Sequence, residues 1–203
     1  MMIRNYVFDL GMVLFRYDTA YMTRLYVADE QDRKLLEDVV FDRKYWDLLD
    51  RGEISDETLK AKVRTRLPGR LHAAADRIYD HWIENLIPIE GMEALIRKIK
   101  QTGAGVYLLS NISEGFAKTY KTVPQINEVL SLFDGFVFSG TVHLAKPDLA
   151  IFRYLLDHYS LEPKTTLFID DNEKNNLAAK KIGLQTYLFN GDVRSLSSYI
   201  KLG

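Results

Sequence analysis

The chain has 203 residues, of which 47% are hydrophobic and 12% aromatic, and this composition is sufficient for a folded core. Its 27 basic and 28 acidic residues give a formal net charge of −1, which argues against the basic surface of a nucleic-acid-binding protein. No apolar run approaches the roughly 20 residues that span a bilayer, and the absence of cysteine excludes a disulfide framework, a thiolate zinc site and a cysteine nucleophile.

The first residues are not those of a signal peptide, because one arginine is followed by a short strand-like run that contains Asp9. We therefore expect a cytoplasmic protein without a nucleic-acid or membrane partner. The length allows one α/β domain with an insertion or two small domains. The oligomeric state is left open.

A buried parallel strand is predicted to begin at Tyr6 and to end at Asp9, with Gly11 two residues further on. In an open α/β sheet, ligands bind at the carboxyl ends of strands. A carboxylate buried there costs folding free energy unless a cation or hydrogen bonds compensate it. Asp9 alone proves little, because capping aspartates commonly follow strands.

Residues 18–86 show little strand-like alternation and several helical stretches. Apolar residues recur at helical spacing between residues 30 and 50. Ser55 is predicted to cap a helix with an acidic first turn, and Pro68–Gly69 breaks the pattern. One more helix is predicted over residues 72–86, so the segment is expected to form a small inserted bundle.

Strands and helices alternate after this segment, which predicts a parallel sheet with right-handed crossovers. The motifs of dinucleotide-binding and P-loop proteins do not occur. We predict an α/β fold, in which residues 1–17 and 87–203 form a Rossmann-like core and residues 18–86 form a helical cap. The further strands are predicted at residues 106–109, 136–139, 166–169 and 186–189.

Polar residues follow three of the strands, and a parallel sheet would bring them to one edge. They are Asp9, Ser110–Asn111 and Asp170–Asp171, and Lys146 stands at the start of a helix nearby. Each alone has an ordinary explanation as a capping residue or a surface lysine. Their occurrence together at one sheet edge is much less expected by chance.

The chemistry of this set is coherent. Three clustered carboxylates repel one another, and Mg²⁺, which prefers oxygen ligands, would relieve the repulsion. A lysine, a hydroxyl and backbone N–H groups suit a phosphate. A carboxylate aligned with phosphorus can act as a nucleophile and form an aspartyl-phosphate.

Four motifs carry a family resemblance: residues 8–14 (FDLGMVL), 109–111 (LSN), 146–148 (KPD) and 168–172 (FIDDN). In order and spacing they resemble those of haloacid dehalogenase superfamily hydrolases with a helical cap inserted after the first motif (subfamily IA). Within that family, residues 51–55 and the Ser–Asn pair resemble the branch that includes α-glucose-1-phosphate phosphatases.

The resemblance implies a Mg²⁺-dependent phosphatase that acts on a small phosphorylated metabolite, such as a sugar 1-phosphate. It implies that Asp9 is the nucleophile and a metal ligand. The backbone carbonyl of Gly11 and the side chain of Asp171 would be further metal ligands. Asp170 would bind the metal through a water molecule or would hold in place the residues that contact the metal.

The resemblance also assigns a phosphate site. Ser110 and the backbone of Asn111 would bind the transferring phosphoryl group, and Lys146 would pair with both the phosphate and Asp9. The cap would close over the substrate and exclude water. Trp46, Tyr45 and the turn at residues 51–53 are candidates for its underside, although Trp46 is expected first as a cap-core residue.

Gly11 departs from the family pattern, in which this position is commonly a second Asp that protonates the leaving group. General acid–base catalysis raises the reaction rate by about 10²–10⁴-fold. Its loss should therefore slow the enzyme while leaving the nucleophile in place. A leaving group that departs easily, such as an anomeric hydroxyl, would suffer least. Glu53, Arg51 and His143 are weak candidates for a substitute.

Three other functions compete with the phosphatase. A metal-independent 2-haloacid dehalogenase would use the same Asp9, but the Asp170–Asp171 pair favours a metal. Phosphonate hydrolysis would need a buried cap lysine, and Lys60 and Lys62 lie in a polar helix pattern. A catalytically weak sugar-phosphate-binding or regulatory protein would explain Gly11 but would not need to keep a nucleophile.

Overall fold

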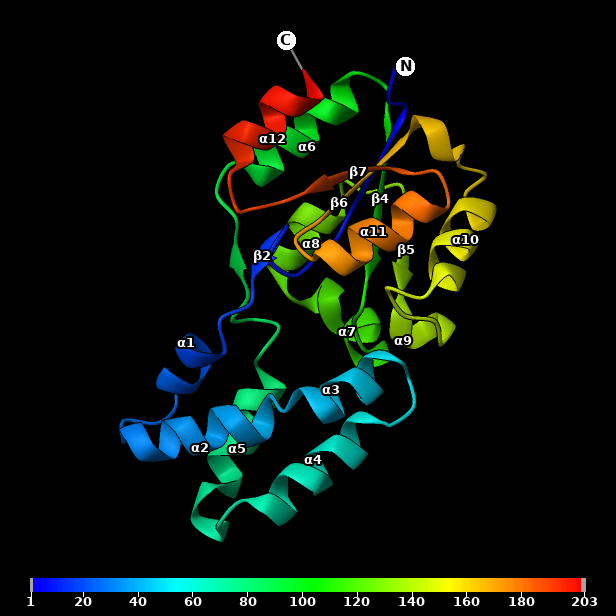
Figure 1. Cartoon of the computed structure of the whole chain (residues 1–203). Helices are drawn as coiled ribbons and strands as arrows, with labels where there is room; N and C mark the ends of the chain where they lie inside the picture. The colour runs from blue at the N-terminus through cyan, green and yellow to red at the C-terminus, as the bar shows by residue number, and fades with distance from the viewer. Residues whose placement is uncertain (1, 202–203) are drawn as a thin grey trace.

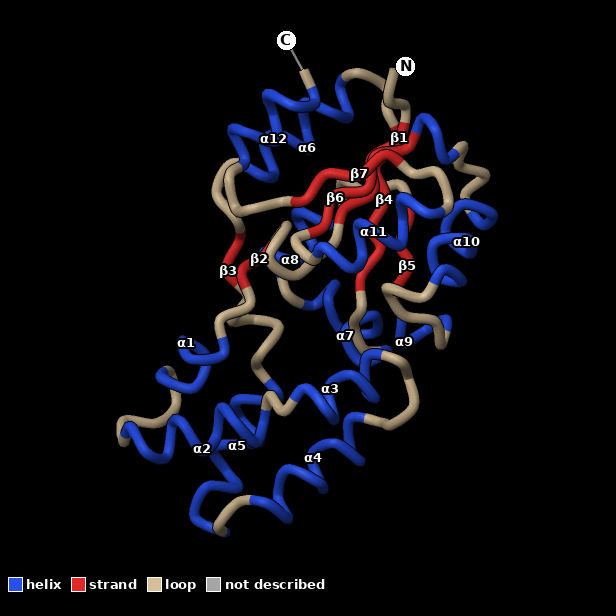
Figure 2. The backbone as a smooth tube through the Cα atoms, viewed as in Figure 1, coloured by secondary structure: helices blue, strands red, loops and turns tan. Residues whose placement is uncertain are grey.

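The computed structural model describes residues 2–201, in which a five-stranded parallel sheet carries helices on both faces (Figure 1). The strand order is β5-β4-β1-β6-β7 (Figure 2), and the α/β prediction is confirmed. The strands are β1 (Asn5–Phe8), β4 (Gly105–Ser110), β5 (Gly135–Phe138), β6 (Thr166–Asp170) and β7 (Gln185–Leu188).

The central strand β1 is buried because its last three residues are apolar and both its edges are paired. Phe8 lies beside Leu108 of β4 and Ile169 of β6, and the backbone N–H of Asp9 donates to the carbonyl of Ile169 at 3.0 Å. The carboxyl ends of these three strands are therefore level. Residues that follow them meet at one edge.

Alternate strand residues pack on opposite faces of the sheet. Val7 belongs to an apolar cluster with α10 and α11, and Phe8 to a larger one with α6, α8 and α12. These helices are α6 (Met92–Gln101), α8 (Pro124–Leu130), α10 (Leu149–His158), α11 (Glu173–Lys181) and α12 (Val193–Ile200), and the shorter ones are α7 (Glu114–Thr119) and α9 (Ser139–Val142). None of the helices in the described residues is long and apolar enough to cross a membrane.

We refer to residues 18–86 as the cap. Two short antiparallel strands join it to the sheet: β2 (Phe15–Arg16) pairs with β3 (Ile87–Pro88), a ribbon too short to be visible in the sequence. The cap helices lie together at one end of the molecule (Figure 1). They are α1 (Thr19–Arg24), α2 (Glu30–Val40), α3 (Arg43–Asp50), α4 (Asp56–Arg66) and α5 (His72–Asp80), with 3₁₀ turns at Gly69–Leu71, Tyr120–Thr122 and Pro163–Thr165.

The predicted cap of α4 is confirmed, because the Ser55 hydroxyl accepts from the backbone N–H of Thr58 at 3.2 Å. The predicted helix over residues 72–86 is too long. It ends at Asp80, and the following turns direct Trp82 and Leu86 toward the core. Trp82 packs edge-on against Trp46 with ring centres 5.4 Å apart, which favours leaving the helix there over continuing it.

Candidate active site

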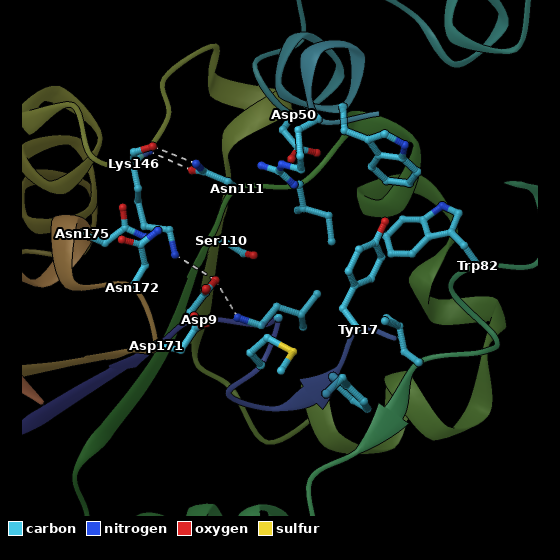
Figure 3. A pocket seen from close by; sticks show the side chains of 18 residues that line it. Asp9, Tyr17, Asp50, Trp82, Ser110, Asn111, Lys146, Asp171, Asn172 and Asn175 are labelled. Carbon is cyan, nitrogen blue, oxygen red and sulfur yellow. Dashed lines mark hydrogen bonds and ion pairs between the residues drawn. The ribbon is translucent and has the colours of Figure 1, made fainter. Parts of the chain in front are cut away.

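The carboxyl edge of the sheet forms the floor of a cavity of about 250 Å³, and the cap forms its roof (Figure 3). Asp9 follows β1, Ser110 ends β4 and Asp171 follows β6. All three line the cavity, together with Lys146 and Asn111. Gly11 lines it as well, so the structure brings together six of the predicted site residues from four distant parts of the chain.

Lys146 is the charged centre of the site. Its ammonium is buried and lies 2.8 Å from Asp9 Oδ1 and 2.7 Å from Asp170 Oδ2. Burial opposes its charge, but the two carboxylates outweigh that effect and raise the pKa of Lys146 above its usual value. Burial also raises the pKa of Asp9 to about 6, against the opposing effect of Lys146. The pair is therefore ionised at neutral pH.

Asn111 holds the backbone of Lys146 in place. Its amide nitrogen donates to the Lys146 carbonyl at 2.8 Å, and its amide oxygen accepts from the Lys146 N–H at 2.8 Å. The Asn111 side chain is therefore committed to the protein, which leaves its backbone for a ligand. Ser110 is a buried residue at the cavity floor. Its hydroxyl makes no hydrogen bond within the described residues but is open to the cavity, so its donor is available to a bound oxygen.

Asp170 is fully buried and saturated by donors. Oδ1 accepts from the Asn172 backbone N–H at 2.8 Å, and the Asn175 side chain contacts both carboxylate oxygens at 3.1 Å. Asn176 holds the Asp170 carbonyl at 2.9 Å. Asn175 and Asn176 were not predicted as site residues. Their sequence pattern could have indicated the role, because asparagine is unfavourable inside a helix unless its side chain makes a specific hydrogen bond, and here two asparagines are adjacent.

Asp9, Asp170 and Asp171 each offer one oxygen within 4.8 Å of the others. Asp171 is exposed, and burial followed by the charge of Asp170 raises its pKa. Clustered hard oxygen donors fit a divalent cation such as Mg²⁺. Because the Asp170 oxygens already have donors, Asp9 and Asp171 are the side chains best placed to hold the ion, with the Gly11 backbone beside them in the cavity wall.

The roof of the cavity combines aromatic and charged side chains: Arg43, Trp46, Asp50 and Trp82 of the cap line it, together with Tyr17, which directly follows β2. Trp46 is therefore both a cap-core residue and a cavity residue. Tyr45 does not line the cavity and lies instead against Arg66, 5.3 Å from its ring centre.

The three suggested substitutes for the missing acid lie elsewhere. Arg51 pairs with Asp148 at 3.0 Å, His143 Nδ1 lies 3.3 Å from the backbone carbonyl of Arg51, and Glu53 is exposed. Arg51 lines only an adjoining cleft, together with Asn111 and Lys146. None of the three lines the cavity itself, so the candidate turn at residues 51–53 does not form its underside. Asp50, one residue earlier, does line it. Lys60, considered for phosphonate chemistry, pairs with Asp80 on the cap surface.

Comparison with known proteins identifies the family of the chain. Residues 9–183 match the family model of haloacid dehalogenase-like hydrolases. Sesquiterpene phosphatase astK of Aspergillus oryzae is 27% identical over 180 residues, which cover 88% of this chain and 85% of the relative. Drimenol cyclase drtB of Aspergillus calidoustus is 28% identical over 194 residues, which cover 93% of this chain but only 34% of that longer protein.

Among solved structures, the magnesium complex of HAD family enzyme bt-2542 from Bacteroides thetaiotaomicron is similar, with a TM-score of 0.71 and 25% identity over 97% of this chain and 98% of that one. The same enzyme with magnesium and inorganic phosphate gives a TM-score of 0.67 at 23% identity, covering 96% and 98%. The family match extends over most of the chain and includes the strand ends that build the cavity. The chain belongs to the haloacid dehalogenase-like hydrolase family.

Proposed function

We propose that the protein is a Mg²⁺-dependent phosphatase that hydrolyses a small organic phosphomonoester through an aspartyl-phosphate on Asp9. The observation that carries this proposal is the buried Lys146 ammonium between Asp9 and Asp170, with Asp171 beside them on the cavity wall. A relative is named a phosphatase, and a structural neighbour was solved with magnesium and phosphate, which supports the same chemistry here.

In this mechanism, Asp9 Oδ2 attacks phosphorus while Oδ1 stays bound to Lys146 and to the backbone N–H of Leu10 at 2.7 Å. Two donors on one oxygen fix the carboxylate plane, so that the other oxygen is directed at the substrate. Lys146 and the Ser110 hydroxyl stabilise charge on the phosphoryl oxygens as the ester bond breaks. Water then hydrolyses the aspartyl-phosphate and restores Asp9.

Asp9, Asp171 and the Gly11 carbonyl would hold the metal. Bound Mg²⁺ supplies charge neutralisation at the phosphoryl oxygens. Asp170 has a different role in this proposal: it holds Lys146 from the side away from the cavity and so keeps the lysine aimed at Asp9.

The substrate class follows from the roof. Aromatic side chains dominate it, and Trp46, Trp82 and Tyr17 offer flat surfaces to a sugar ring or to an apolar tail. The family branch that the sequence resembles favours a sugar 1-phosphate, which we keep as the proposed substrate. Phosphates of apolar alcohols are the alternative substrate class to be tested beside it, because one relative of the chain is named a sesquiterpene phosphatase.

Two competing functions make different demands on this site. A 2-haloacid dehalogenase needs no cation and hence no cluster of carboxylates to bind one, whereas Asp9, Asp170 and Asp171 form such a cluster. A sugar-phosphate-binding protein needs no nucleophile held by a buried ammonium.

The test is phosphate release from a panel of hexose 1-phosphates, hexose 6-phosphates and isoprenyl phosphates, with and without Mg²⁺. We expect Mg²⁺-dependent release that Asp9→Asn lowers by at least about 10³-fold. Chloride release from 2-chloropropionate without metal would favour the dehalogenase. Binding of sugar phosphates without any turnover would favour the regulatory protein.

A further inference from the structure

A phosphatase built on this site lacks one part, which is a proton donor for the leaving group. Gly11 stands where a second carboxylate would otherwise reach into the cavity, and a Cβ placed there meets no atom within 4 Å. The floor of the cavity therefore supplies a nucleophile and charge-stabilising groups but leaves open space where an acid would be. Asp171, the other core carboxyl group that lines the cavity, is assigned to the metal, so an acid is sought in the roof.

Asp50 is the carboxyl group in the roof of the cavity. It is the last residue of α3, is 7% exposed, and lies across the cavity from Asp9 (Figure 3). Its carboxyl group makes no hydrogen bond or ion pair with any described residue. Asp47 on the same helix is different, because it is exposed and paired with Arg43. The carboxyl oxygens are open to the cavity. A charged carboxylate in so buried a place is costly without a partner, and a role in the reaction would explain its presence.

We propose that Asp50 is the general acid–base residue of the reaction, supplied by the cap in place of the core residue that Gly11 lacks. This inference rests on the proposed phosphatase function and adds to it the source of the proton. It makes the closed cap part of the chemistry as well as a barrier to water.

The surroundings of Asp50 keep the proton on it. Burial raises its pKa to about 8, and the charges of Asp47 and Asp9 act in the same direction while Arg43 and Lys146 oppose it. Six titratable or charged groups interact with Asp50. Arg43 and Asp47 belong to its own helix, and Tyr79 belongs to cap helix α5. Tyr17 follows β2, and Asp9 and Lys146 belong to the core. Asp50 is therefore neutral at pH 7 and ready to donate.

The two half-reactions balance around this residue. In the first, Asp9 bonds to phosphorus, the bond from phosphorus to the ester oxygen breaks, and the Asp50 proton passes to that oxygen to release the alcohol. In the second, water attacks phosphorus, the Asp50 carboxylate accepts a proton from it, and the bond to Asp9 breaks. Inorganic phosphate leaves, and both carboxyl groups return to their starting states.

Leaving-group chemistry provides a test that a structural role would not satisfy. p-Nitrophenolate leaves without protonation, whereas an alkoxide does not. We compare kcat/KM for p-nitrophenyl phosphate with that for an alkyl phosphate, because this ratio reports the transfer to Asp9. Asp50→Asn should lower the alkyl value by about 10²–10⁴-fold and the aryl value by less than about tenfold, with a burst of p-nitrophenol as the phosphoenzyme accumulates.

The controls keep shape and charge comparable. Asp50→Glu retains a carboxyl group and should recover part of the alkyl activity. Glu53→Gln removes an exposed cap carboxyl group three residues away and should leave both rates unchanged. In the unmodified enzyme, kcat/KM for the alkyl ester should fall above about pH 8, and this basic limb should be absent for the aryl ester.

Equal losses on the two esters in folded Asp50→Asn, or no loss on either, would overturn the role of Asp50. If Asp50→Asn does not fold, the pH profiles of the unmodified enzyme decide: identical basic limbs for both esters would also overturn it. Failure of the phosphatase proposal gives a separate result, in which the unmodified enzyme hydrolyses neither ester or Asp9→Asn retains full activity.

Discussion

The hydroxyl of Ser139, at the start of α9 in the core, donates a hydrogen bond to the backbone carbonyl of Asp50, the last residue of cap helix α3. The same hydroxyl accepts from the backbone N–H of Ile112 at 2.8 Å. One buried side chain therefore connects the loop after β4 to the end of cap helix α3 and fixes the position of the Asp50 backbone relative to the core. Gly52 allows this close approach, because a Cβ there would lie 2.6 Å from the carbonyl of Gly140.

Replacing Ser139 should remove one of the hydrogen bonds that hold the cap against the core. Ser139→Ala leaves a buried N–H and a buried carbonyl without their partner, at a cost of about 1–3 kcal/mol. We expect a matching loss of unfolding free energy in urea and a larger fall in kcat/KM for alkyl than for aryl phosphates, since Asp50 would lose its position. Ser131→Ala, which removes an exposed local hydrogen bond to Glu128, is the control and should change neither measurement.

The sequence predicted the sheet and its edge well, for a physical reason. The strands that build the site are short, mostly apolar runs, and the residue after a strand lies at the carboxyl edge whatever the details of packing. Asp9, Ser110 and Asp171 therefore lie together as expected.

The roof could not be predicted in this way. Which cap residue faces the cavity depends on the rotation and tilt of α3, which Ser139 and Gly52 set through contacts about 90 residues apart in the chain. From the sequence, Asp50 consequently looks like an ordinary polar residue, whereas its neighbours Arg51 and Glu53 are suggested as substitutes for the missing acid. The ribbon of β2 and β3 was missed because two-residue strands show no periodicity.

Lys146 should be essential to stability as well as to catalysis. Lys146→Met keeps most of the volume but leaves Asp9 and Asp170 as neighbouring buried carboxylates without a cation, which typically costs about 3–5 kcal/mol. The urea midpoint should fall accordingly in metal-free buffer. Lys164→Met removes an exposed lysine and should leave the midpoint within error. An unchanged midpoint for Lys146→Met would show that the buried ion triad does not form.

Asp171 should affect metal binding without affecting the fold. Because the side chain is exposed, Asp171→Asn should change the unfolding free energy by no more than about 0.5 kcal/mol. It should raise the Mg²⁺ concentration for half-maximal activity by at least about tenfold, and calorimetry with Mg²⁺ alone should show the same shift. Glu173→Gln, an exposed neighbour, is the control; an equal shift in both variants would indicate a general charge effect and not a lost ligand.

A carboxyl group at position 11 should partly replace Asp50. The space around the Gly11 Cβ position is open and the backbone there is not left-handed, so the Cβ of Gly11→Asp meets no neighbour. In the Asp50→Asn background we expect it to raise kcat/KM for alkyl phosphates by at least about tenfold. Gly11→Asn in the same background has the same shape but cannot transfer the proton, and it should give no recovery. Equal recovery by both would mean that filling the space, and not acid catalysis, limits the variant.

The stability of the protein should depend on pH through Asp50. In the unfolded chain its pKa is the ordinary 3.8, whereas burial raises the folded value to about 8. Between these values the folded state binds more protons than the unfolded state, so stability is highest below pH 4 for this group and is lost as pH rises toward 8. Asp50→Asn cannot titrate and should lose less unfolding free energy between pH 5 and pH 8.5 than the unmodified protein, as measured by urea midpoints in metal-free buffer. Glu53→Gln, which removes an exposed cap carboxyl group three residues from Asp50, should follow the unmodified curve. Parallel curves for Asp50→Asn and the unmodified protein would show that Asp50 is already ionised at pH 5, and a carboxylate in that state could not protonate a leaving group.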